Sequence, residues 1–172
     1  MKILFTLVLA LSAYAADDVC KPIFDATDKT GITANHMYTT STKESQKGRT
    51  VNGELIRMGG PSGAMYVLVE GKWKRVPGTP ADMLKQSQEN RNTTKHSCRY
   101  VREEAVNGEA TVVYAAHSES EYAKVDMTVW ISKSKGLTVR QDVDMDVGGL
   151  MGKSHTSSRY DYTNVAPPPG VQ

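Results

Sequence analysis

Two neighbouring segments of the chain alternate apolar and polar residues with the two-residue period of a β-strand. They lie within residues 122–147, on either side of the polar run Lys133-Ser134-Lys135-Gly136. Their apolar positions are Ala123, Val125, Met127, Val129, Ile131, Leu137, Val139, Val143, Met145 and Val147. Because successive side chains of a strand point to opposite faces, each segment turns one face inward and one to water. Such a hairpin is not stable alone, so more strands must extend the sheet and a further layer must cover its apolar face.

The same pattern predicts how the two strands pair. A three-residue loop, Ser134-Lys135-Gly136, would join them, with Gly136 in the left-handed conformation that such loops require. This register pairs the water-facing residues as Trp130 with Arg140, Lys124 with Asp146, and Asp126 with Asp144. The last pair opposes two like charges and is unfavourable.

The remainder of the chain predicts short strands joined by hairpin-length loops, with two helices. Strands are expected at about 35–43, 50–58, 65–69, 72–76, 97–105, 110–118 and 154–163, and helices at about 20–31 and 80–91. Pro22 suits the first turn of the first helix, and Thr79 suits the cap of the second. The second helix has few apolar residues, so we expect it to pack on one edge of the sheet. This order predicts a mainly β (α+β) fold: a curled antiparallel sheet, or unclosed β-barrel, with two short covering helices.

The N-terminus has the features of a secretory signal. An apolar run from Ile3 to Leu11 follows one lysine, and Ala13 and Ala15 have the spacing that a signal peptidase recognises. The run is too short for a stable membrane span. We therefore expect a signal peptide at 1–15, a single β domain at 16–165 and a flexible Pro-rich tail at 166–172, in a periplasmic or secreted protein without a lipid anchor. The formal net charge of +2 argues against a nucleic-acid partner.

Export also determines the interpretation of the two cysteines, Cys20 and Cys98. In an oxidising compartment an isolated pair favours a disulfide over two free thiols. Their separation excludes a redox C-x-x-C motif, and two thiols so far apart do not by themselves indicate a zinc site.

No motif for catalysis or for a resident metal stands out. The histidines, His36, His96, His117 and His155, fall on four predicted segments without metal-ligand spacing, although a site assembled across strands stays open. Asp142, Asp144 and Asp146 share one strand face and could bind Ca²⁺ with help from a loop, but a solvated face paired to Lys124 is favoured. No Gly-x-Ser-x-Gly sequence or split carboxylate pair supports a hydrolase. We predict no enzyme activity and no cofactor.

The inward row of the long hairpin is the candidate ligand-binding surface. Its members are Val125, Met127, Val129, Gln141, Val143 and Met145. Methionine often lines adaptable apolar sites, although most of these methionines also suit a plain core. Gln141 interrupts the row, and a buried amide there would either contact irregular backbone or offer a polar group inside a cavity.

The segment Val129-Trp130-Ile131-Ser132, the turn that ends in Gly136-Leu137, and Arg140 together resemble the strand-turn-strand of LolA-like periplasmic lipoprotein carriers. The predicted order of elements also resembles that superfamily. The resemblance implies an unclosed barrel with a lid helix midway, whose concave apolar face holds lipid or lipoprotein acyl chains. It assigns no functional residue to a position in this chain.

Together these observations predict an exported, non-enzymatic protein that binds a lipid or another hydrophobic ligand in a concave sheet, with the loop at 148–152 as a movable rim. The alternative is a ligand-free protein-interaction or envelope-stress module of the same fold, which would contact an envelope protein. A cavity of several hundred Å³ lined by Val, Met and Leu would favour the first, and a packed interior the second.

Overall fold

A computed structural model describes residues 16–44, 48–148 and 152–171 of the chain. The expected signal peptide and part of the expected rim loop lie outside these residues. Within the described residues, no helix is long and apolar enough to cross a membrane.

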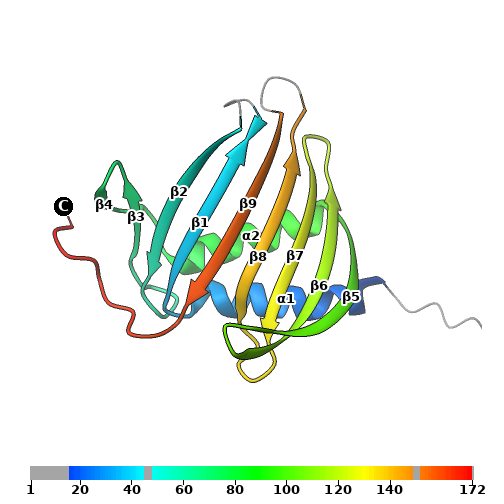
Figure 1. Cartoon of the computed structure of the whole chain (residues 1–172), viewed down its shortest axis with the longest axis horizontal. Helices are drawn as coiled ribbons and strands as arrows, with labels where there is room; N and C mark the ends of the chain where they lie inside the picture. The colour runs from blue at the N-terminus through cyan, green and yellow to red at the C-terminus, as the bar shows by residue number, and fades with distance from the viewer. Residues whose placement is uncertain (1–15, 45–47, 149–151, 172) are drawn as a thin grey trace, which may run out of the picture.

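All strands of the described residues belong to one antiparallel sheet (Figure 1). The elements, in chain order, are α1 (Ala16–Ile32), β1 (Asn35–Lys43), β2 (Arg49–Arg57), β3 (Met65–Val69), β4 (Lys72–Arg75), α2 (Pro80–Thr93), β5 (Lys95–Val106), β6 (Glu109–Glu119), β7 (Lys124–Ser132), β8 (Thr138–Asp146) and β9 (Lys153–Asp161). The strand order across the sheet is β4-β3-β2-β1-β9-β8-β7-β6-β5. β4 and β5 are the two edges, so the curled sheet does not close. The predicted fold class and order of elements are confirmed.

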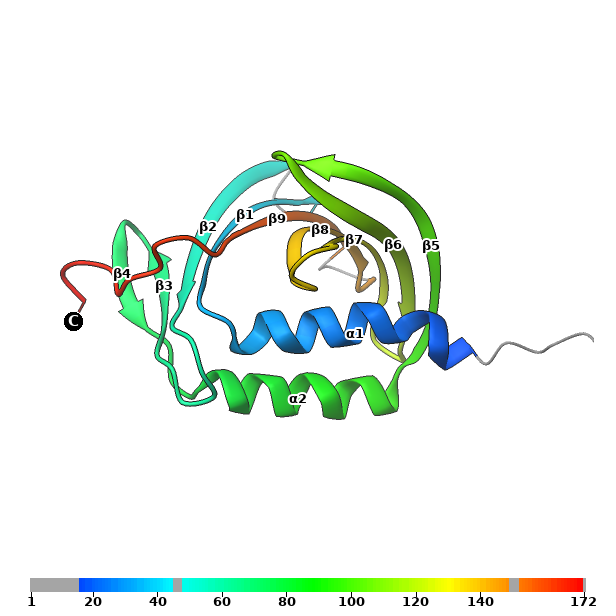
Figure 2. The ribbon, with the colours of Figure 1, turned by 90° about the horizontal axis from the view of Figure 1, so that it is seen from below.

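Both helices lie on one side of the sheet, which we call its inner face. Figure 2 shows that α1 runs inside the curl and that α2 lies beyond α1, farther from the strands. The expectation that α2 packs on a sheet edge is therefore wrong. The polar side of α2 meets α1 instead: Gln88 Nε2 donates to Asp28 Oδ2 at 3.0 Å, and the Arg91 guanidinium lies 4.8 Å from the centre of the Phe24 ring.

The inner core forms where α1 crosses the long hairpin. Val129 and Ile131 of β7 are buried against Ile23 and Ala26 of α1. The alternation of apolar residues thus orients β7 as predicted, because the side chains that point inward are those that α1 covers.

The register of the long hairpin is confirmed, but its turn is one residue longer than predicted. Trp130 pairs with Arg140, as expected. The backbone N–H of Ser132 donates to the carbonyl of Leu137 at 2.9 Å, so the loop has four residues, with Gly136 at φ +63°. Ile131 pairs with Thr138, which leaves Val139 as the extra residue of a β-bulge that restores the predicted register.

The bulge changes which face Val139 covers. Val139 packs with Trp130 and Val113 in a second core on the outer face, opposite the helices. The sequence places Val139 inward and Trp130 toward water, and both assignments are wrong. Trp130 is only 5% exposed. One extra residue inverts the alternation locally, so Val139 turns outward and helps to cover the indole.

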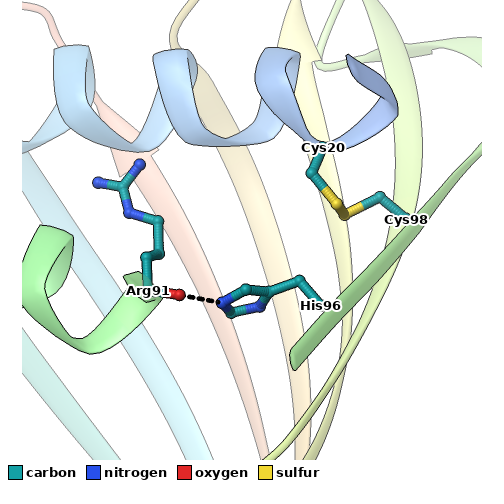
Figure 3. The surroundings of a disulfide bond; sticks show 4 residues. All are labelled: Cys20, Arg91, His96 and Cys98. Carbon is teal, nitrogen blue, oxygen red and sulfur yellow. Dashed lines mark hydrogen bonds between the residues drawn. A yellow bond between two sulfur atoms is a disulfide. The ribbon is translucent and has the colours of Figure 1, made fainter. Parts of the chain in front are cut away.

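A disulfide joins Cys20 and Cys98, as predicted, and ties α1 to the edge strand β5 (Figure 3). His96, beside it, donates from Nε2 to the carbonyl of Arg91 at 3.2 Å. α1 begins at Ala16 rather than near Cys20, so Pro22 lies inside the helix and not in its first turn. In the expected tail, Pro168 is buried.

Candidate functional site

A hollow of about 190 Å³ lies where α1, α2 and the inner face of the sheet meet. Its lining comes from α1 (Thr27, Thr30, Gly31), α2 (Pro80, Met83, Leu84, Ser87) and the sheet (Arg57, Thr138, Gln141, Tyr160). One side of the lining is apolar and the other is polar. A cavity of roughly 150 Å³ is enough to hold benzene, so this hollow has room for a few methylene groups and a small polar head.

The apolar side belongs to α2, whose first turn is well anchored. Thr79 caps the helix: its backbone N–H donates to Asp82 Oδ2 at 2.8 Å, and its hydroxyl accepts from Asp82 N at 3.3 Å. Hydrogen bonds from Thr79 also hold the pKa of Asp82 below its usual value. The N–H of Ala81 donates to the carbonyl of Pro61 at 3.0 Å. These contacts set Pro80, Met83 and Leu84 over the hollow as its roof.

The polar side belongs to the sheet. Arg57, the last residue of β2, donates from Nη1 to the Thr30 carbonyl at 3.4 Å, and its Nε is buried without a hydrogen-bond partner. No carboxylate among the described residues forms an ion pair with it. Burial lowers the pKa of Arg57 and raises that of Tyr160, so a guanidinium and a neutral phenol share this wall.

The adjoining wall is held by hydrogen bonds between its own groups. The Tyr162 hydroxyl donates to the Thr138 carbonyl, and the Thr30 hydroxyl accepts from the Thr138 N–H at 3.0 Å. Burial raises the pKa of Tyr162, which keeps its phenol protonated as a donor. Tyr160 and Gln141, in contrast, make no side-chain hydrogen bond within the described part of the chain. Their polar groups remain available to a ligand.

The residues predicted to bind a ligand do not surround one cavity. Val129 is 1% exposed and packs under α1, with Met127 against the same cluster. Val125 and Val143 are half-buried, and Met145 is 38% exposed near the far end of the sheet. Only Gln141 lines the hollow under α2. Its amide contacts a cavity, which is one of the two alternatives that the sequence leaves open.

Sequence reasoning did not identify Arg57, Tyr160 or the roof residues. Arg57 pairs with Asn35 across β1 and β2, and Tyr160 pairs with Met37 across β9 and β1. Their alternation within each strand would have placed both on the inner face. The position of α2 could not be predicted, because a helix with few apolar residues shows no clear buried face in the sequence.

The outer face holds a charged row across four strands, in the order His155, Asp144, Asp126 and His117. Each histidine Nδ1 lies 2.8 Å from the carboxylate beside it. Within residues 16–44, 48–148 and 152–171, no group of three potential ligands is placed to hold a metal ion. A hollow of about 750 Å³ beside this row is lined by charged residues of both signs together with Met145, one of the residues predicted to bind a ligand.

The pairing expected for the aspartate row is also different. Lys124 forms its ion pair with Glu119, at 3.0 Å, and not with the aspartates. Asp142 instead pairs with Arg140 at 2.6 Å and accepts from Ser157 at 2.7 Å. Nearer partners on the same face therefore replace the predicted lysine.

Asp28 is the polar anchor between α1 and α2, because it accepts hydrogen bonds from both Arg91 and Gln88. Replacing Asp28 with alanine should loosen α2 and destabilise the protein by about 1 kcal/mol, since charge-assisted hydrogen bonds contribute more than neutral ones but partial exposure weakens them. Hydrogen exchange should accelerate in α2 and stay unchanged in β7. Asp25→Ala, on the exposed side of α1, is the matched control. Equal exchange of α2 in both variants would contradict the anchor.

No family model and no curated protein matches the chain. Several solved structures do. A DUF1329 family protein from Desulfovibrio piger aligns with a TM-score of 0.35 and 10% identity, over 91% of this chain and 95% of that one. MucB, determined in complex with MucA(peri), aligns with a TM-score of 0.41 and 16% identity, over 90% of this chain and 58% of that one. A LolA superfamily protein from Nitrosomonas europaea aligns with a TM-score of 0.29 and 8% identity, over 87% of this chain and 92% of that one. The matches include the superfamily that the sequence resembles, and TM-scores this low support no conclusion about ligand or partner.

Proposed function

We propose that this chain is an exported, non-enzymatic binding protein that holds the apolar part of a small lipid-like ligand in the hollow under α2. The observation that supports the proposal is the hollow itself, which Pro80, Met83 and Leu84 of α2 roof. The disulfide is consistent with an oxidising compartment such as the periplasm.

The size of the hollow limits what can bind. Burying about five methylenes would contribute roughly 4 kcal/mol before ordering costs, which corresponds to millimolar affinity for a purely apolar contact. A longer chain must leave the hollow along Met83, which is 46% exposed, or displace α2. Single-chain ligands are therefore favoured over bulky ones.

The alternative, a ligand-free interaction module that contacts an envelope protein, has its own supporting observation. Val129, in the row predicted to line a cavity, packs directly against Ile23 and Ala26 of α1. Native mass spectrometry of the freshly purified mature protein separates the two proposals. A mass above that of the bare chain, removed by organic extraction, supports the binding protein, and a bare chain that also fails to bind added octan-1-ol supports the module.

Filling the hollow should abolish binding. Leu84→Trp places a large side chain in the roof, so we expect no detectable binding of octan-1-ol while the melting temperature stays the same or rises. Titration calorimetry with octan-1-ol is the measurement. Lys85→Trp, on the exposed side of the same helix, should bind as the wild type does. Unchanged binding to a folded Leu84→Trp variant would show that the ligand lies elsewhere.

A further inference from the structure

The polar wall of the hollow contains a cation without a counter-ion. Arg57 makes one hydrogen bond, to the Thr30 carbonyl at 3.4 Å, and its Nε is buried and unsatisfied. No acidic side chain in the described ranges pairs with it, although eight other lysines and arginines there pair with carboxylates. A partly buried guanidinium without an anion is costly, and an arriving anion would reduce that cost.

Two further groups of the same hollow can donate hydrogen bonds. Tyr160 and Gln141 both line the hollow, and neither side chain makes a hydrogen bond within the described residues. The arrangement therefore combines one planar cation with two neutral donors. Such a set matches the oxygens of a carboxylate or phosphate, which accept several hydrogen bonds at once.

The opposite wall determines what the anion is attached to. Pro80, Met83 and Leu84 offer apolar surface and no charge. An inorganic anion would leave that surface in contact with water, whereas an amphiphile would satisfy both walls. The hollow thus favours a molecule with one anionic end and one apolar end.

We infer that Arg57 is the headgroup-binding residue of this hollow, receiving the carboxylate or phosphate of a single-chain amphiphile whose apolar part lies under α2. The inference rests on the proposed function and deepens it. Arginine suits this role because its flat fork can donate two parallel hydrogen bonds to two oxygens of one headgroup. Tyr160 and Gln141 would donate to the oxygens that Arg57 leaves free.

The test compares ligands of equal chain length on the full mature protein by titration calorimetry. Octanoate, octyl phosphate and octan-1-ol each contain eight carbons and differ in the headgroup; the one alkyl carbon that octanoate lacks changes the affinity by only about fourfold. We expect at least one of the two anions to bind wild-type protein tenfold or more tightly than octan-1-ol. A preference for octanoate assigns a carboxylate, a preference for octyl phosphate assigns a phosphate, and both outcomes support the inference. Equal affinity for all three overturns it and leaves the proposed function intact, whereas no binding of any of them overturns both.

Two variants of the same strand locate the effect. Arg57→Gln should lose the preference for the anion while its affinity for octan-1-ol changes less than threefold. Arg49→Gln removes the same charge from an exposed position of β2 and should keep the preference. If Arg49→Gln loses as much of the preference for the anion as Arg57→Gln does, the preference arises from the overall charge of the protein and the inference fails. If Arg57→Gln does not fold, Arg57→Lys is the alternative variant, because it keeps the charge and should retain part of the preference for the anion. Full loss or full retention of that preference in Arg57→Lys would contradict paired hydrogen bonds from the guanidinium to the headgroup.

Discussion

Replacing both Cys20 and Cys98 with serine is expected to lower the free energy of unfolding by roughly 4 kcal/mol. The bond closes a loop of 78 residues, and in the chain-entropy account a loop of this length restricts the unfolded chain by about that amount. For a domain of this size, such a loss corresponds to a fall in melting temperature of roughly 8–16 °C. Denaturant unfolding and differential scanning calorimetry measure both quantities.

The control for the double serine variant is the wild-type protein unfolded in the presence of a reductant. The reduced wild-type protein should lose the same free energy of unfolding as the double serine variant, since both treatments remove the same cross-link. Thiol titration of denatured, non-reduced wild-type protein should find no free thiol. Two reactive thiols per chain would show that the disulfide does not form in solution. A loss of stability below about 1 kcal/mol would show that it does not stabilise the folded protein.

Removing the indole of Trp130 should have the second large effect. The side chain is buried with Val113 and Val139 on the outer face, and Arg140 stacks on it with its guanidinium 4.5 Å from the ring centre. Truncation of a buried aromatic residue typically costs 3–5 kcal/mol. We expect Trp130→Ala to destabilise the protein by about 3 kcal/mol, because solvent can reach part of the space left on an outer face.

Thr128→Ala is the matched control for this prediction, because Thr128 is the preceding outward residue of the same strand. It should change the free energy of unfolding by less than about 0.5 kcal/mol. Similar losses of stability in Trp130→Ala and Thr128→Ala would mean that the cluster of Trp130, Val113 and Val139 does not contribute to stability. Urea unfolding with unchanged slopes would show that the loss arises in the folded state.

The candidate site was only partly predictable. Gln141 was identified because a polar residue interrupts an apolar row, which is a local signal. Arg57 gave no such signal, since an arginine at the end of a strand is ordinarily solvated. Its significance depends on α2, which contacts α1 mainly through polar groups such as Gln88 and Arg91. Polar contacts between distant segments leave no periodic pattern in a sequence.

The strands of the sheet and most of their pairing were predictable from local residue patterns. Alternating residues from Val125 to Met145 indicate which face turns inward, and the predicted register of Trp130 with Arg140 is observed because the bulge at Val139 offsets the longer turn. These features are local, because backbone geometry imposes a period of two on any strand. Three features were visible only in the folded chain: Val139 bulges outward to cover Trp130, α1 fills the space beneath Val129, and α2 roofs a hollow facing Arg57. Each of these depends on which distant surfaces meet, and packing free energy rather than local pattern selects among them.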